Sequence, residues 1–168
     1  KLESASKQII EETSKLENIL RRPDHRGKWG EFKLRTTVEH AQMQKYVDFE
    51  EQVTIGNGQT YRPDMVIKLP SNGRIVVDSK LPFDHYNKAV EDRKNASEHL
   101  DNHVKLLEKH IHDLSTKRYW EHVEGSPDFV VMFVGIESAL VAALEHKPEL
   151  LESAMKKNVL ITSPSTLI

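Results

Sequence analysis

The feature that most limits the possible folds of this chain is an unbroken apolar run at residues 129–134, which directly follows Asp128. Alternate side chains of a strand point to opposite faces of a sheet, so a strand of this composition is apolar on both faces. Strands of this kind are typical of the interior of a sheet that is covered on both sides. The run therefore predicts a central strand.

Before this run, the hydrophobic period changes from helical to extended. Residues 26–44 are predicted to form a helix, whereas residues 47–55, 60–69 and 74–80 alternate as strands do. A Gly-Asn-Gly turn separates the first two of these strands, and a Pro-Ser-Asn-Gly turn separates the second from the third. Three consecutive strands joined by tight turns predict an antiparallel meander.

After the meander, residues 84–122 are predicted to form one long polar helix, on the order of 55 Å from end to end. The central strand is followed by a helix over residues 137–157, bent near Pro148, and by a last strand over residues 159–162. The complete order is helix, three strands, long helix, strand, helix, strand. It predicts an α/β fold with a mixed β-sheet flanked by helices.

The first residues have a different pattern from the rest of the chain. Leu2, Ile9 and Leu16 repeat every seven residues, which is typical of a coiled coil. Pro23 then breaks the helix. Residues 1–22 are therefore predicted to be the end of a coiled-coil helix.

The remaining residues, 24–168, are predicted to form one domain. The chain begins without Met, and residues 165–168 read like the start of a helix. We therefore expect it to be a piece of a longer protein that is truncated at its C-terminus.

The composition excludes several functional classes. With 24 Lys and Arg residues against 26 Asp and Glu residues, the net charge is -2, which argues against a basic-tail nucleic-acid binder but allows a local basic groove. Cysteine is absent, so disulfide scaffolds, thiolate zinc sites and cysteine nucleophiles are excluded. The sequence shows no signal peptide and no apolar run near the roughly 18 residues that a membrane span needs.

Charged residues gather at the ends of two predicted meander strands. Pro63-Asp64 opens the apolar part of the second strand, and Asp78 and Lys80 lie on one face of the third. Pairing of these strands brings Asp64 and Asp78 together. Two carboxylates about 4 Å apart repel by roughly 4 kcal/mol at an effective dielectric near 20, and a divalent cation offsets this cost while gaining hard oxygen ligands. A surface cluster of salt bridges remains an alternative for an Asp-x-Lys pattern by itself.

The combination of Pro63-Asp64, the Asp78-Ser79-Lys80 triplet and a preceding helix with Glu31 resembles the PD-(D/E)xK nuclease superfamily. Its common core, a helix, a three-stranded meander, a helix and a strand, is similar to the predicted order. Over about residues 24–168 the chain also resembles the RmuC family of bacterial DNA recombination proteins. The matching segments are residues 26–31, 61–64, 76–80 and 128–133.

The resemblance implies a restriction-endonuclease-like fold and a role for each site residue. Asp64 and Asp78 would bind Mg²⁺ or Mn²⁺, with the backbone carbonyl of Ser79 as a third ligand. Lys80 would orient or activate the attacking water and stabilise charge on the phosphate. Glu31 would complete the metal shell directly or through water; its alternative is a helix-surface acid.

The same resemblance implies a metal-dependent DNA endonuclease that acts in recombination or repair and limits rearrangement at inverted repeats or branched DNA. The expected partners are DNA, whether single-stranded, hairpin or branched, and further copies of the chain through the coiled coil. The domain is expected to be cytoplasmic. Members of the family typically have a membrane anchor ahead of the coil, so the resemblance implies that the full-length protein is anchored through a segment that precedes this chain.

Four basic residues are candidates for contacts with DNA. Arg26, Lys28 and Arg62 lie close to the predicted site in the sequence and could bind phosphates, or form ion pairs at a solvated rim. Lys117 begins a basic and aromatic stretch, residues 117–120, of the kind found in single-strand binders. A helix end packed on the sheet explains its aromatic residues equally well.

Nine histidines suggest a metal site of a second kind. His99, His103 and His110 share one face of the predicted long helix. No Cys and no His-Glu-x-x-His pattern accompanies them, so a solvated amphipathic face is the simpler interpretation.

Two other functions remain open. A catalytically silent module could bind DNA ends or branched DNA on the same fold. An oligomeric scaffold could use the coiled coil and the long helix, with Asp64, Asp78 and Lys80 as a structural ion network. The sequence leaves the DNA structure, the cleavage polarity and the preferred metal undetermined.

Overall fold

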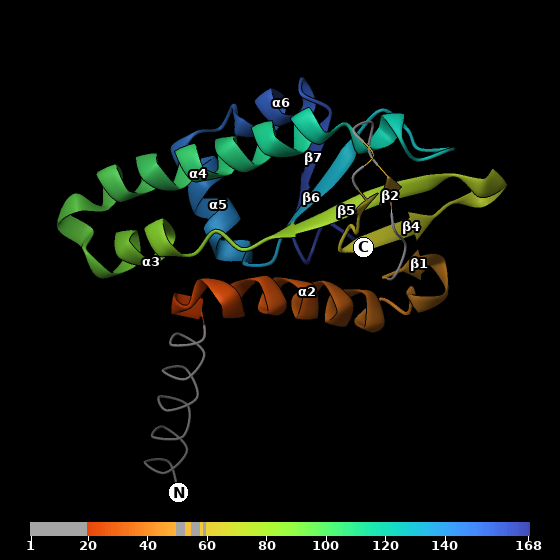
Figure 1. Ribbon diagram of the computed structural model, residues 1–168. Helices are drawn as coiled ribbons and strands as arrows, with labels where there is room; N and C mark the ends of the chain where they lie inside the picture. The colour runs from red at the N-terminus through yellow and green to blue at the C-terminus, as the bar shows by residue number, and fades with distance from the viewer. Residues whose placement is uncertain (1–19, 50–52, 55–57, 59) are drawn as a thin grey trace, which may run out of the picture.

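The computed structural model describes residues 20–49, 53–54, 58 and 60–168, and in this part of the chain a five-stranded sheet lies between helices (Figure 1). The strand order is β1-β4-β5-β6-β7. Strands β1, β4 and β5 pair antiparallel, while β5, β6 and β7 pair parallel, so the predicted mixed sheet is confirmed. The bounds are β1 Val47–Asp48, β4 Met65–Lys68, β5 Arg74–Lys80, β6 Val130–Val134 and β7 Val159–Thr162.

Helices cover both faces of this sheet. Helix α2 lies along one face, and α4 lies along the other with α5 and α6 (Figure 1). Single 3₁₀ turns connect several of the elements. The helical bounds are α2 Pro23–His40, η1 Gln44–Tyr46, η2 Pro70–Asn72, α3 Asp84–Glu91, η3 Arg93–Asn95, α4 Ala96–Lys117, η4 Tyr119–Glu121, α5 Glu137–His146 and α6 Leu150–Met155. In the described residues, no helix has both the length and the apolar character to cross a membrane.

Strand β5 divides the core into two layers. Val76 packs with Leu107 and Tyr119 in the layer beneath α4, whereas Val77 packs with Leu34 in the layer beneath α2. Because side chains alternate along a strand, Asp78 and Lys80 share the face of Val76, and Ser79 shares the face of Val77. The two layers thereby fix which helix each site residue faces.

The prediction of a continuous first strand over residues 47–55 is wrong. Its beginning is β1, which pairs with β4, whereas its second part is β2, Val53–Thr54, which pairs with β3, Thr60–Tyr61, in a separate two-stranded sheet. The predicted second strand is divided in the same way, because Arg62, Pro63 and Asp64 separate β3 from β4. Pro63 has no backbone N–H to donate to a ladder, and this favours the interruption.

The prediction of one helix from residue 84 to residue 122 is also wrong. Helices α3 and α4 pack against each other side by side, and η3 forms the turn between them (Figure 1). Asp92 leaves the helical conformation at φ -108° and ψ 78°, and its side chain accepts a hydrogen bond from the Asn95 backbone N–H. This contact begins a new helical segment, as Asp does at helix N-termini generally. The chain therefore reverses direction here.

The other predictions about the order of elements are confirmed. Pro23 begins α2, as expected for a proline in the first turn, so the helix starts and ends earlier than the predicted residues 26–44. Strand β6 is buried along its whole length, the last helix is interrupted around Pro148, and β7 follows. The predicted coiled coil lies almost entirely outside the described residues, which begin at residue 20.

Candidate functional site

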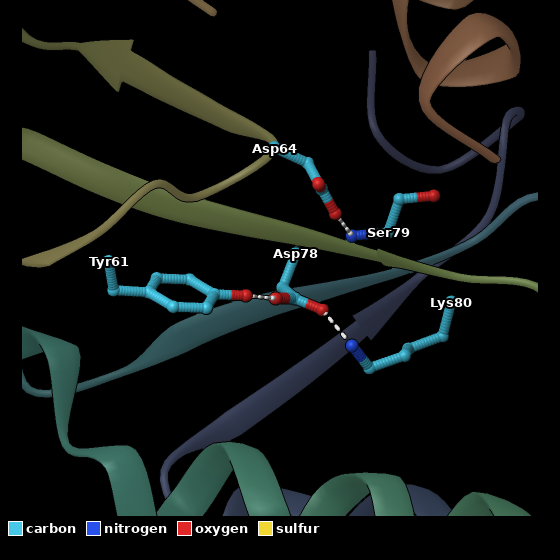
Figure 2. Close-up of polar contacts among 5 residues, drawn as sticks. All are labelled: Tyr61, Asp64, Asp78, Ser79 and Lys80. Carbon is cyan, nitrogen blue, oxygen red and sulfur yellow. Dashed lines mark hydrogen bonds and ion pairs between the residues drawn. The ribbon is translucent and has the colours of Figure 1, made fainter. Parts of the chain in front are cut away.

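Asp78 lies near the end of β5 and is only 1% exposed. The Tyr61 hydroxyl donates a hydrogen bond to its Oδ2 over 2.7 Å, and the Lys80 ammonium forms an ion pair with its Oδ1 (Figure 2). The prediction that Asp78 and Lys80 share a face is therefore confirmed. A buried carboxylate is costly unless it is paired, and here both oxygens have a protein donor.

Tyr61 keeps its proton in this arrangement. Burial and the negative charge of Asp78 raise the pKa of its phenol above the usual value. The phenol is therefore neutral across the physiological range and donates to the carboxylate. Sequence reasoning did not select Tyr61 as a site residue, although it stands two residues before Pro63 in a segment that supported the family resemblance.

Asp64 lies immediately before β4, whose first residue, Met65, pairs with Val77. This register places Asp64 beside the end of β5, where its Oδ2 accepts a hydrogen bond of 2.6 Å from the Ser79 backbone N–H (Figure 2). Burial and the charge of Asp78 raise the pKa of Asp64 to about 6, against the opposing effect of the Ser79 N–H. The negative charge of Asp78 therefore acts on Asp64 across the paired strands.

Glu31 of α2 lies on the same pocket as Asp64. Both residues line a pocket of about 170 Å³, together with Arg35, Phe49 and Arg62. The charge of Glu31 contributes to the raised pKa of Asp64. Arg62 donates from Nε and Nη2 to the Phe49 carbonyl oxygen over 3.2 and 3.0 Å, so it braces the pocket wall.

The predicted site residues thus form two neighbouring groups. Asp78 and Lys80 face α4, and Glu31 faces Asp64 from α2 on the other side of the sheet. Within the residues that the structure describes, no three His, Asp or Glu side chains are gathered closely enough to form a metal cluster. Magnesium sites commonly use only one or two carboxylates with water and phosphate oxygens, and the neighbouring Asp64 and Asp78 carboxylates fit such a site.

Gly30 allows α2 to approach β5 at the centre of the site. A Cβ atom at this position would lie 2.7 Å from Ser79 Oγ, which is buried and has no hydrogen-bond partner among the described residues. The glycine in the Trp29-Gly30-Glu31 segment therefore sets the distance between the helix and the strand.

Two hollows open beside Lys80, one against the end of α4 and one between α2 and α4. One has a volume of about 650 Å³ and includes Lys117, and the other has a volume of about 410 Å³ and includes Arg26. Lys80 and His110 line both hollows. Of the four predicted DNA contacts, Arg26 and Lys117 are therefore near Lys80.

The other two predicted DNA contacts lie elsewhere. Arg62 lines the pocket of Glu31 and Asp64, and Lys28 is exposed on α2 without lining either hollow beside Lys80. The aromatic residues after Lys117 pack in the core, as expected for a helix end that lies on the sheet. Tyr119 is fully buried, and its ring stacks on Tyr61 with the centroids 4.9 Å apart. Trp120 packs against the same core.

The three histidines of the predicted solvated face have different environments. His103 is fully buried, with Nε2 2.8 Å from the Ala139 carbonyl oxygen, so the prediction of a solvated face is wrong at this position. The Nε2 atom of His99 lies 3.4 Å from Oδ2 of Asp92. His110 is partly buried and faces the site. Both His103 and His110 directly precede apolar residues of the α4 seam, and this spacing was a signal that they point inward.

We expect His110 to make the protein less stable in acid. Burial and the positive charge of Lys80 lower its pKa to about 4, although Asp113 and Asp78 oppose this and Lys109 adds to it. An unfolded chain has a histidine pKa near 6.5. Stability from neutral His110 is therefore fully present above about pH 6.5 and is lost as the pH falls toward 4.

The check is urea unfolding of His110→Gln across that pH range, with His40→Gln at the exposed end of α2 as the control. The free energy of unfolding should depend less steeply on pH in His110→Gln than in the unmodified chain. Asp64, with its pKa of about 6, takes up a proton in the folded state over the same pH range and therefore stabilises the protein as the pH falls. This opposing contribution is the same in the unmodified chain, His110→Gln and His40→Gln. Parallel curves for His110→Gln and the unmodified chain would contradict the prediction.

Comparisons with known proteins agree on one family. The family model described as the RmuC family matches residues 1–168. The chain is 38% identical over 167 residues to a DNA recombination protein RmuC homolog of Chlamydia muridarum, covering 98% of this chain and 38% of that protein. It is 39% identical over 164 residues to the homolog of Zymomonas mobilis, with coverages of 95% and 37%.

A third relative, the homolog of Pseudomonas aeruginosa, is 34% identical over 174 residues, covering 100% of this chain and 38% of that protein. The chain therefore spans 37% to 38% of the length of these three relatives. No solved structure matches the chain.

Proposed function

The chain belongs to the RmuC family, and from this premise we propose that it acts in DNA recombination as a metal-dependent nuclease of the PD-(D/E)xK type. The proposal includes a restriction-endonuclease-like fold, which the mixed sheet between helices supports. The observation that carries it is the buried Asp78–Lys80 pair beside Asp64, a carboxyl group with a pKa raised to about 6. Perturbed acids next to a lysine at a hollow are typical of catalytic sites.

In this proposal each residue has a defined role. Asp64 and Asp78 would hold Mg²⁺ or Mn²⁺ with the Ser79 carbonyl oxygen, and Glu31 would act directly or through water. The metal ion would supply charge neutralisation and a water of lowered pKa. Lys80, held in place by Asp78, would orient that water and stabilise negative charge on the phosphate. Tyr61 would keep the Asp78 carboxylate in position.

The test is Mn²⁺ titration by calorimetry, together with cleavage of a labelled hairpin DNA, for the unmodified chain and Asp78→Ala. We expect the variant to lose both metal binding and cleavage, because it removes a metal ligand and the partner of Lys80. Asp128→Ala is the matched control, since Asp128 is exposed and precedes β6 at the opposite end of the sheet. Full cleavage by Asp78→Ala would refute the nuclease proposal.

A DNA-binding module without catalysis is the second candidate. The observation in its favour is that both oxygens of Asp78 already have protein donors, Tyr61 and Lys80. An ion network of this kind needs no metal to be stable. DNA binding that persists in EDTA, together with no cleavage in Mg²⁺ or Mn²⁺, would select this candidate.

A further inference from the structure

The two hollows beside Lys80 share walls made by the same elements. Helix α4 contributes Leu106, His110, Asp113 and Lys117, whose spacing of four, three and four residues places them along one helical face. Helix α2 contributes Arg26 on the opposite side. The end of β5 runs between the two helices (Figure 1) and supplies Lys80, so the hollows meet at this strand end.

We infer that the two hollows form one groove that seats a single polynucleotide strand, with one phosphate at Lys80, one at Lys117 and one at Arg26. The inference rests on the proposed function only in placing the reacting phosphate at Lys80. Seating of the strand does not require cleavage. The groove therefore defines the substrate class as single-stranded nucleic acid or the single-stranded part of a hairpin.

The three cations differ in their present partners. Arg26 forms an ion pair with Asp84, with Nη1 2.6 Å from Oδ2, and Lys80 is paired with Asp78. The Lys117 ammonium instead lies over the Tyr61 ring, 4.3 Å from its centroid, and within the described residues it has no ion pair with a carboxylate. A phosphate at Lys117 replaces no ion pair, so this residue should make the largest individual contribution to phosphate binding.

The lining favours one strand over a duplex. Lys80 lines both hollows, Arg26 lines one and Lys117 lines the other, so one strand along the groove would meet the three cations in turn, whereas a duplex presents two backbones. The hollows are also lined by Leu106 and the imidazole rings of His110 and His122, together with the carboxylates of Asp113 and of Asp84, which is paired with Arg26. Unpaired bases pack on apolar and aromatic groups of this kind, while the bases of a duplex have their faces covered.

The experiment measures binding of a fluorescein-labelled thymidine oligonucleotide of about 12 nucleotides by anisotropy, in EDTA and across a range of NaCl concentrations. Lys117→Ala should lower the affinity about 3- to 10-fold and reduce the slope of log K against log salt by about 0.7 to 1. Lys117→Arg should retain binding. Arg118→Ala is the matched control, because Arg118 is exposed and paired with Glu121 outside the groove.

Circular dichroism melting of each variant verifies that it is folded, and a duplex of equal length is the competitor. Unchanged binding by Lys117→Ala, an equal loss in Arg118→Ala, or tighter binding of the duplex through Lys117 would each overturn the inference. A chain that binds the strand through Lys117 but cleaves no DNA with any divalent metal would refute the nuclease proposal and leave the groove intact. If the chain cleaves DNA but Lys117→Ala binds the strand as tightly as the unmodified chain does, the groove is refuted and the nuclease proposal stands.

Discussion

Lys80→Met is expected to lower the rate of metal-dependent DNA cleavage about a hundred- to thousandfold while Mn²⁺ binding persists. Methionine keeps the aliphatic part of the side chain and removes the ammonium that would stabilise charge at the phosphate. The ligands Asp64 and Asp78 remain in place. Single-turnover cleavage and calorimetric titration on the same sample separate the chemical step from metal binding.

The same substitution should reduce the free energy of unfolding by about 2 to 3 kcal/mol, because it leaves the buried Asp78 carboxylate with Tyr61 as its one remaining donor among the described residues. The double variant Asp78→Asn with Lys80→Met removes both charges and should recover most of that stability without recovering cleavage. Lys109→Ala, exposed on α4, is the control for loss of a lysine. Cleavage by Lys80→Met at the unmodified rate would exclude Lys80 from the reaction.

The largest expected loss of stability follows from Tyr119→Ala. Tyr119 is fully buried between β5 and α4, and it stacks on Tyr61. Removing a buried aromatic ring of this size typically costs about 3 to 5 kcal/mol, which is a large part of the stability of a domain. Urea unfolding followed by circular dichroism measures the change.

The two stacked tyrosines should respond in opposite ways to loss of the hydroxyl. The Tyr119 hydroxyl is buried without a hydrogen-bond partner among the described residues, so Tyr119→Phe should leave the stability within about 0.5 kcal/mol or increase it slightly. The Tyr61 hydroxyl binds a buried carboxylate, so Tyr61→Phe should cost about 1.5 to 3 kcal/mol. Equal losses in the two Phe variants would contradict this assignment of partners.

Much of the fold could be predicted because local patterns and tertiary structure agree. The apolar run that forms β6, the turn before β5 and the break at Pro23 all depend on neighbouring residues. The reversal at Asp92 was missed because residues 84–122 contain enough helix-forming residues to favour continuous helix throughout. The position of the break is decided by packing of α3 on α4, and the one local signal was an Asp three residues before Asn95, a pattern typical of a helix start.

The candidate site was predictable to the same extent. Asp78 and Lys80 follow from strand alternation, and Asp64 follows from pairing of adjacent strands. Tyr61 and His110 were missed as site residues because their positions depend on how β3 and α4 pack beside β5, and periodicity contains no information about that packing. The separation of Glu31 from Asp78 by the sheet likewise becomes visible only in three dimensions.

Strand β5 also joins two parts of the sheet that form by routes of very different length. Its partner β4 is linked to it by a tight turn, so this hairpin can form locally, on the microsecond scale. Its partner β6 pairs only after residues 81–129 have crossed over, and pairings of such long separation form late in folding. During synthesis the hairpin therefore precedes the parallel pairing of Asp78 with Met132 and of Lys80 with Val134. The site consequently reaches its final arrangement late in folding. A nascent chain that ends before β6 has the acidic and basic residues of the site but not the neighbouring strand that orders them.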